Sequence, residues 1–80
     1  MVVASHAVDG CRLYLYDGVG NILYSFDLAT TVMRSYDGGQ VWIKDLSGTC
    51  FVFSSTLLAD LSLSVVDIQA MIAGCTQGTN

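Results

Sequence analysis

The chain is 80 residues long, enough for one domain near the lower size limit for a self-supporting core, and its formal net charge is −4. Charged residues make up 12% and hydrophobic residues 52%, whereas an ordinary soluble domain has roughly 25% charged residues, so part of the apolar surface is expected to face a partner. With three cations against seven aspartates and no apolar run of about 20 residues, neither nucleic-acid binding nor membrane association is expected.

Two related segments, 9–22 and 37–50, form the clearest internal pattern of the sequence. Four positions are identical between them: Asp9/Asp37, Gly10/Gly38, Asp17/Asp45 and Gly20/Gly48. An aspartate that caps its own turn, followed three residues later by a glycine in the left-handed region, is typical of a short hairpin. We therefore expect residues 13–17 to pair antiparallel with 21–26, and residues 41–45 with 49–54.

Two further strands are expected around these hairpins. The Asp-Gly turns that open the hairpins leave room for a strand at 31–36 and for a first strand within 2–8. The short connections predict an antiparallel meander of five or six strands, arranged as a small sandwich or a barrel-like sheet. Duplication and the repeated use of one hairpin chemistry both explain the similarity of the two segments.

After residue 54 the apolar residues recur at spacings of three and four. They are Leu58, Leu61, Val65, Ile68, Ile72 and Cys75. This seam predicts one helix over about 57–73, with Ser55 or Thr56 as its N-cap and Gly74 as its C-cap glycine. The seam could pack on the chain's own sheet or in a bundle with neighbouring subunits.

A second interpretation of this region divides it at residue 65. The alternation Leu-Ser-Leu-Ser-Val over 61–65 allows a strand, and Ser64-x-x-Asp67 is then the capping box of a shorter helix. In either case the chain is one mainly β domain of the α+β class, with a β meander over 1–54, a C-terminal helix over 55–75 and a polar, frayed tail over 76–80.

The sequence contains no constellation typical of catalysis or metal binding, so no enzyme activity, metal or cofactor is expected. His6, the single histidine, has no favourable spacing to a cysteine or serine, and the three cysteines lack a Cys-x-x-Cys pair. Cys11, Cys50 and Cys75 are expected to be buried free thiols in a reducing compartment, and one disulfide between Cys11 and Cys50 is the alternative. The first residues show no signal-peptide pattern.

The aromatic residues suggest where a partner would bind. Leu13 and Leu15 alternate with Tyr14 and Tyr16, so both faces of this strand are apolar, and one helix can cover only one face of a small sheet. The tyrosines fit an interface or the rim of a barrel equally well, and Trp42 is expected to be buried. The residues predicted to mediate self-association are Tyr14, Tyr16, Trp42, Leu58, Leu61, Val65, Ile68 and Ile72.

Residues 16–21, Tyr-Asp-Gly-Val-Gly-Asn, with Leu23, resemble the hairpin of YD-repeat shell proteins. In style, the segments 13–27, 40–53 and 58–75 together resemble small virion proteins of tailed phages, such as capsid decoration and fibre-base subunits. The resemblance to virion proteins implies assembly without chemistry, in a virion whose subunits are made in a cytoplasm, and no functional residue is carried over from it.

The sequence therefore predicts a non-catalytic, self-assembling structural subunit. Its expected partners are copies of itself, as a trimer or a dimer, and other structural proteins. The alternative is a small monomeric binding module that presents aromatic residues to a protein or ligand. A third and more distant possibility is an enzyme subunit whose site another chain completes.

Overall fold

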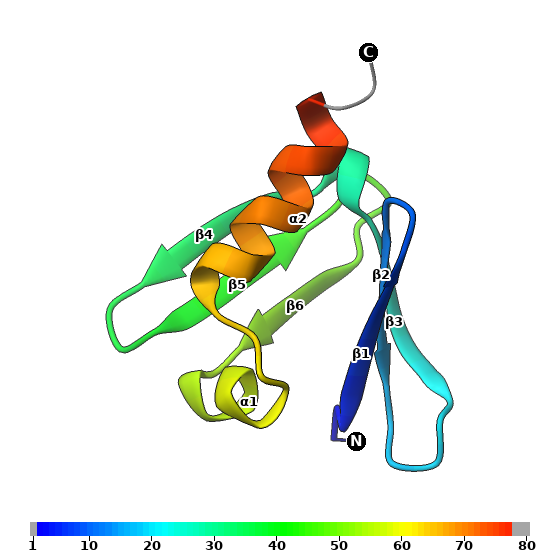
Figure 1. Ribbon diagram of the computed structural model, residues 1–80, viewed down its shortest axis with the longest axis vertical. Helices are drawn as coiled ribbons and strands as arrows, with labels where there is room; N and C mark the ends of the chain where they lie inside the picture. The colour runs from blue at the N-terminus through cyan, green and yellow to red at the C-terminus, as the bar shows by residue number, and fades with distance from the viewer. Residues whose placement is uncertain (1, 78–80) are drawn as a thin grey trace.

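The computed structural model of the chain describes residues 2–77 and contains six strands, one 3-10 helix and two α-helices (Figure 1). The strands are β1 (Ser5–Asp9), β2 (Arg12–Tyr16), β3 (Ile22–Asp27), β4 (Val32–Tyr36), β5 (Gln40–Lys44) and β6 (Cys50–Phe53). The helical segments are η1 (Leu28–Thr30), α1 (Ser55–Asp60) and α2 (Val65–Gln77).

The strands form two separate antiparallel sheets of three strands, in the orders β1-β2-β3 and β4-β5-β6. The predicted mainly β, α+β fold with a helical C-terminal region is confirmed, but the single continuous meander is wrong. Between β3 and β4 the chain turns through η1, where the Asp27 side chain accepts a hydrogen bond from the N–H of Ala29. The N–H of Leu28 then donates to the carbonyl of Cys11 at 2.8 Å, so the chain leaves the first sheet before β4 begins.

The two sheets repeat one plan. β2 begins at residue 12 and β5 at residue 40, an offset of 28 that matches the repeat in the sequence. Both turns place the glycine in the left-handed region, with φ of 92° at Gly20 and 97° at Gly48. The glycine N–H donates to the carbonyl of Asp17 at 3.2 Å in one turn and of Asp45 at 3.1 Å in the other. Both predicted hairpins are confirmed.

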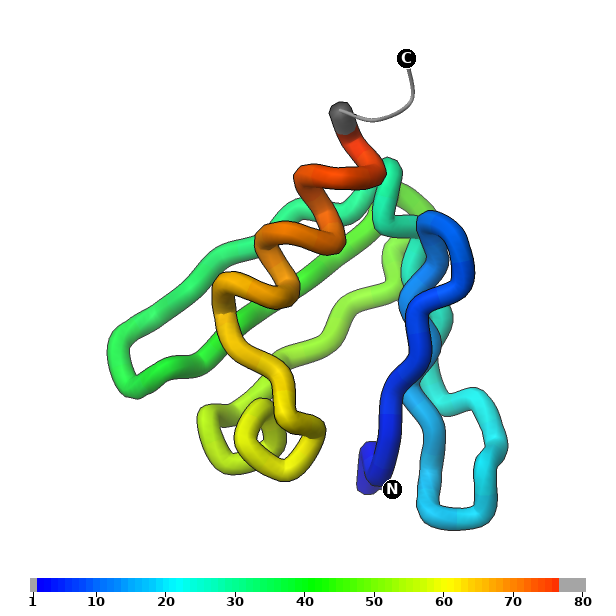
Figure 2. The backbone as a smooth tube through the Cα atoms, viewed as in Figure 1, coloured from blue at the N-terminus to red at the C-terminus, as the bar shows by residue number. Residues whose placement is uncertain are grey.

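A common core fills the space between the sheets and beneath the helices. The middle strands contribute two inward-facing residues each, and the next strands contribute one phenylalanine each. These six side chains are Leu13, Leu15, Phe26, Val41, Ile43 and Phe53, all essentially inaccessible to solvent. Figure 2 shows the two sheets meeting close to η1 and diverging away from it, with α2 lying across the second sheet.

The rings of Tyr24 and Phe51 pack against each other across the two sheets, with centroids 4.8 Å apart. Tyr24 lies opposite Leu15 in the first sheet and Phe51 lies opposite Ile43 in the second, so the two rings occupy equivalent positions. Contact between equivalent positions is what an approximate two-fold relation between two copies of one unit produces. The two three-stranded sheets therefore pack so that equivalent positions meet, an arrangement that both explanations of the sequence similarity allow.

The C-terminal region contains two helices, so the predicted single helix over 57–73 is wrong. Ser54 caps α1 by accepting a hydrogen bond from the N–H of Leu57 at 3.1 Å. Ser62, at φ 55°, ends it in the left-handed region. α2 then opens with the capping box of the second interpretation: the N–H of Asp67 donates to Ser64 Oγ at 3.1 Å, and the N–H of Ser64 donates to Asp67 Oδ2 at 2.9 Å.

The structure corrects three predictions about where the C-terminal helical region begins, how it is interrupted and where it ends. The N-cap of α1 is Ser54 instead of Ser55 or Thr56, and the segment 61–65 contains no strand. Gly74 lies inside α2, because the helix continues to Gln77; residues 76–77 of the predicted tail therefore belong to it, and residues 78–80 lie outside the described residues. Neither described helix has the length and apolar character to span a bilayer.

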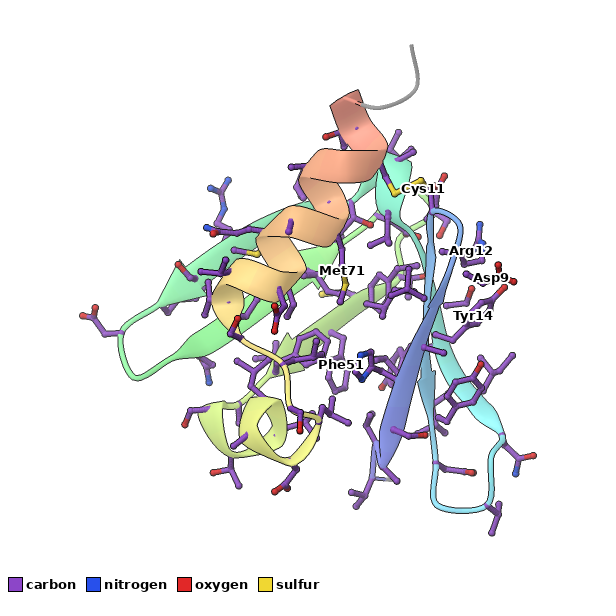
Figure 3. All side chains as sticks on the ribbon, viewed as in Figure 1. Asp9, Cys11, Arg12, Tyr14, Phe51 and Met71 are labelled. Carbon is purple, nitrogen blue, oxygen red and sulfur yellow. A yellow bond between two sulfur atoms is a disulfide. The ribbon has the colours of Figure 1, made fainter. Side chains whose placement is uncertain are left out.

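A disulfide joins Cys11, in the β1–β2 turn, to Cys75 near the end of α2, with 5.6 Å between the Cα atoms (Figure 3). Cys50 is free and exposed on β6. Both the expected buried thiols and the alternative pairing of Cys11 with Cys50 are therefore wrong. Cys75 is the last buried residue of the apolar seam, and the packing of α2 brings this end of the seam onto the β1–β2 turn.

Candidate functional site

The apolar seam that the sequence assigns to self-association closes the chain's own core. Leu58, Leu61 and Ile68 are buried, and Val65 and Ile72 are half-buried and pack against the same cluster. The sheet-packed arrangement is the one observed. These residues leave little surface for a partner. Their apolar spacing does mark buried positions, but they are buried within the chain itself.

Tyr14 and Tyr16 of β2 lie on the outer face of the first sheet and are half-buried. The rings of Tyr14 and Tyr16 stack with centroids 6.2 Å apart. Beside them Arg12 donates from Nη1 to Ser25 Oγ at 2.8 Å. The side chains of this face therefore partly cover one another, and a role of Tyr14 and Tyr16 in self-association stays a prediction.

Trp42 is 43% exposed, so its predicted burial is wrong. It lies on β5 between Val41 and Ile43, both of which point into the core. Because side chains alternate along a strand, Trp42 points to the opposite face of the sheet. The helices pack on the core side of this sheet, and none of the elements within residues 2–77 covers its outer face.

The outer face of β4-β5-β6, here named the basic aromatic face, combines apolar and cationic side chains. The strand register places Arg34 opposite Trp42 and Val32 opposite Lys44. On the other side of β5, Lys44 lies opposite Cys50. Trp42 therefore has one cation beside it on the neighbouring strand and another two residues along its own strand.

An open groove of about 390 Å³ lies on this face. Its lining residues are Val32, Arg34, Tyr36, Trp42, Ile43, Lys44 and Cys50. The rings of Tyr36 and Trp42 meet edge to face, with centroids 5.7 Å apart, and Tyr36 is 49% exposed. Two aromatic rings thus line the groove together with Arg34 from β4 and Lys44 from β5.

The charge of this face is opposite to that of the rest of the chain. Two of the three cations of the chain line the groove, and none of the lining residues is acidic. The remainder carries Arg12 against seven aspartates, a formal charge of −6. An acidic, partly apolar surface is therefore the chemical complement of the groove.

The sequence carries only an indirect signal of this face, the alternation of residues along two strands. Val32, Arg34 and Tyr36 alternate with residues that point inward, and Trp42 and Lys44 do the same on the next strand. Reading them as one face requires knowing that β4 pairs with β5 and that the helices cover the other side. The apolar spacing of the sequence predicts the helical seam as the self-association surface and gives no weight to a face that includes two cations.

Within residues 2–77, no group of three or more His, Cys, Asp or Glu side chains could hold a metal ion. The basic aromatic face presents two aromatic rings, two cations and the free thiol of Cys50, groups that can contact a partner surface. No protein-family model, curated protein or solved structure matches the chain.

Proposed function

We propose that this chain is a non-catalytic structural subunit that assembles with copies of itself through the basic aromatic face. The observation that carries the proposal is the pair of large exposed rings, Tyr36 and Trp42, which meet edge to face on the outer side of β4 and β5. Tryptophan, tyrosine and arginine are the residues most enriched at the energetic centres of protein interfaces, and all three meet here. The virion setting suggested by the style of the sequence stays a prediction.

A monomeric binding module is the second candidate, and one observation favours it. The chain buries its own helical seam, and the disulfide between Cys11 and Cys75 closes the fold without help from another subunit. A chain that completes its own core does not need a partner to fold. In this case the basic aromatic face would bind a different protein.

Mass measurement separates the two candidates. Self-assembly predicts a trimer or a dimer of the 8.5 kDa chain by light scattering coupled to gel filtration at tens of micromolar. Trp42→Ser is expected to shift the mass to that of the monomer. Leu46→Ser, which removes an apolar side chain that is exposed elsewhere, is the matched control and should leave the mass unchanged. A monomer at all workable concentrations would overturn the self-assembly proposal and leave the binding module.

A further inference from the structure

β4 is an edge strand of the second sheet. Within residues 2–77 it pairs with β5 on one side, and no strand pairs with it on the other (Figure 1). In an antiparallel sheet, alternate residues of an edge strand direct their backbone N–H and C=O groups away from the neighbour that the strand already has. An extended segment of another chain can pair with these groups and add one strand to the sheet.

The groove of the basic aromatic face includes this edge. Every second residue of β4 lines it, namely Val32, Arg34 and Tyr36. All three are exposed, and Val32 keeps 65% of its accessible surface. A segment added to β4 would place alternate side chains directly opposite these three residues. The groove therefore supplies side-chain contacts where the free edge supplies backbone contacts.

The other edge strands lack this combination. β1 has a free side as well, but it contains Asp9 and neither arginine nor lysine, and none of its residues lines the groove. β3 and β6 face each other across the two sheets through the packed rings of Tyr24 and Phe51. β4 is therefore the edge best equipped to select a particular segment.

The three outward residues of β4 define which segment fits. Arg34 is the middle residue of the strand, with Val32 and Tyr36 two positions away on either side. A cation on an edge strand opposes pairing with an apolar or basic residue and favours a carboxylate opposite it. Val32 and Tyr36 favour apolar residues opposite them. The complementary pattern is apolar-x-acidic-x-apolar, which reads the same in both chain directions.

This chain does not offer such a segment in extended form. Its own sequence comes close to the pattern at residues 7–11, Ala-Val-Asp-Gly-Cys, and at residues 15–19, Leu-Tyr-Asp-Gly-Val. The first stretch runs from β1 through the β1–β2 turn, and the second runs from β2 into the β2–β3 turn. Neither can lie flat along an edge strand while the first sheet is folded. The occupant of the β4 edge is therefore a segment of a different protein.

From this arrangement we propose that the free edge of β4 binds an extended apolar-x-acidic-x-apolar segment of another protein by strand addition. The carboxylate of the segment meets Arg34, and its apolar residues pack beside Val32 and Tyr36. Lys44, one strand further into the sheet, adds to the positive potential of the groove. The inference goes beyond the proposed function, because it names a ligand that would compete with copies of the chain for the same face.

The first test uses Trp42, the single tryptophan of the chain, as a fluorescent reporter on the face. The capped peptide Thr-Val-Thr-Asp-Thr-Val-Thr is expected to change its emission in a saturable way. With asparagine at the centre, the peptide should bind about threefold to fivefold more weakly at low salt. Arg34→Gln should remove this difference between the two peptides. Arg12→Gln, which removes a cation from the first sheet, is the matched control and should preserve it. Equal binding of both peptides to the unmodified chain would overturn the role of Arg34.

The second test asks whether the peptide backbone takes part. One peptide is methylated on the backbone nitrogens of its valines and aspartate, and another on those of its threonines. In an added strand only one of these two sets pairs with β4, so one methylated peptide should lose binding and the other should retain it. Any other pattern would overturn strand addition. Equally tight binding of inorganic tripolyphosphate would overturn it too, since that anion has charge but no peptide backbone.

Light scattering with and without the peptide separates this inference from the proposed function. If the chain assembles through the basic aromatic face, saturating peptide should shift the mass toward that of the monomer. An oligomer that does not bind the peptide would overturn the inference and leave self-assembly intact. An oligomer that binds it without dissociating would support the inference and contradict assembly through this face. A monomer that binds the peptide would overturn self-assembly alone, and a monomer that does not would overturn both.

Discussion

The carboxylate of Asp45 accepts a hydrogen bond of 3.0 Å from the backbone N–H of Asp27, and this bond ties the β5–β6 turn to the end of β3. The other oxygen of Asp45 accepts from the hydroxyl of Ser47 and the N–H of Thr49, so the side chain is fully engaged and only 4% exposed. Asp17 occupies the equivalent position in the first sheet and bonds only within its own turn. One of two repeated turn aspartates thus links the sheets.

The first prediction compares these two aspartates. Asp45→Ala is expected to lower the free energy of unfolding by about 2 kcal/mol, because it removes a link between the sheets and leaves the N–H of Asp27 without its acceptor. Asp17→Ala removes the same side chain from an exposed turn and should cost clearly less. Urea denaturation of both variants measures the difference. Equal losses would show that the bond between the sheets contributes nothing beyond the turn itself.

The second prediction concerns acid. The N–H of Asn21 is the main group that lowers the pKa of Asp17 below its ordinary value of 3.8. Burial raises the pKa of Asp45, but hydrogen bonds from Ser47, Asp27 and Thr49 outweigh it, and the net pKa is also lowered. As the pH falls below 3.8, these two carboxylates bind protons more readily in the unfolded chain than in the folded chain, and this difference favours unfolding.

Stability is therefore expected to be level from neutral pH to roughly pH 5 and to fall as the pH drops through and below 3.8. The melting temperature measured across this range should fall less steeply in Asp45→Asn than in the unmodified chain, because the variant has one fewer carboxylate to protonate. A steeper fall in the variant would contradict the lowered pKa of Asp45.

The hairpins could be predicted because their determinants are local. Asp17 with Gly20, and Asp45 with Gly48, specify each turn within four residues. The division into two sheets could not be predicted in this way. It depends on η1, whose Leu28 N–H finds its acceptor at Cys11, a residue 17 positions earlier in the chain.

The single helix was predicted wrongly because the apolar spacing continues across residues 61–64 although the backbone there is not helical. The apolar spacing continues through Leu61 as if the helix were unbroken. However, the N–H of Leu63 donates to the carbonyl of Leu58 and the N–H of Ser62 to that of Ala59, the paired bonds of a left-handed helix C-cap. Serine replaces the glycine that normally signals such a cap. The disulfide and the exposed Trp42 likewise depend on tertiary packing, which no spacing reveals.

The third prediction follows from that cap. Ser62 has a φ of 55°, a conformation that glycine adopts without steric cost and serine does not. Ser62→Gly is expected to raise the free energy of unfolding by roughly 0.5–1 kcal/mol. Ser64→Gly is the contrasting variant; it removes the hydroxyl that caps α2 and should destabilise. Chemical denaturation of the two proteins would test the assignment, and destabilisation by Ser62→Gly would refute it.

The fourth prediction concerns the disulfide. The bond between Cys11 and Cys75 closes a loop with a sequence separation of 64, and the chain-entropy relation gives about 4 kcal/mol for a loop of this length. Cys11→Ser with Cys75→Ser, or reduction of the unmodified chain, should therefore lower the melting temperature strongly. Cys50→Ser should leave it unchanged, since that thiol is free and exposed. If reduction had no effect on the melting temperature, the bond would not be part of the folded state in solution.

The last prediction places the seam inside the fold. Ile68 is 1% exposed and belongs to the cluster that includes residues of both sheets, so Ile68→Asp would bury a carboxylate with no partner. The expected cost of several kcal/mol is a large part of the stability of a domain this small. The variant should therefore lose its β signal in circular dichroism as well as any oligomer. Val66→Asp makes the same change two residues earlier on an exposed position of α2, and should keep the fold. An Ile68→Asp protein that melts at the same temperature as the unmodified chain would show that α2 does not pack on the core through this residue.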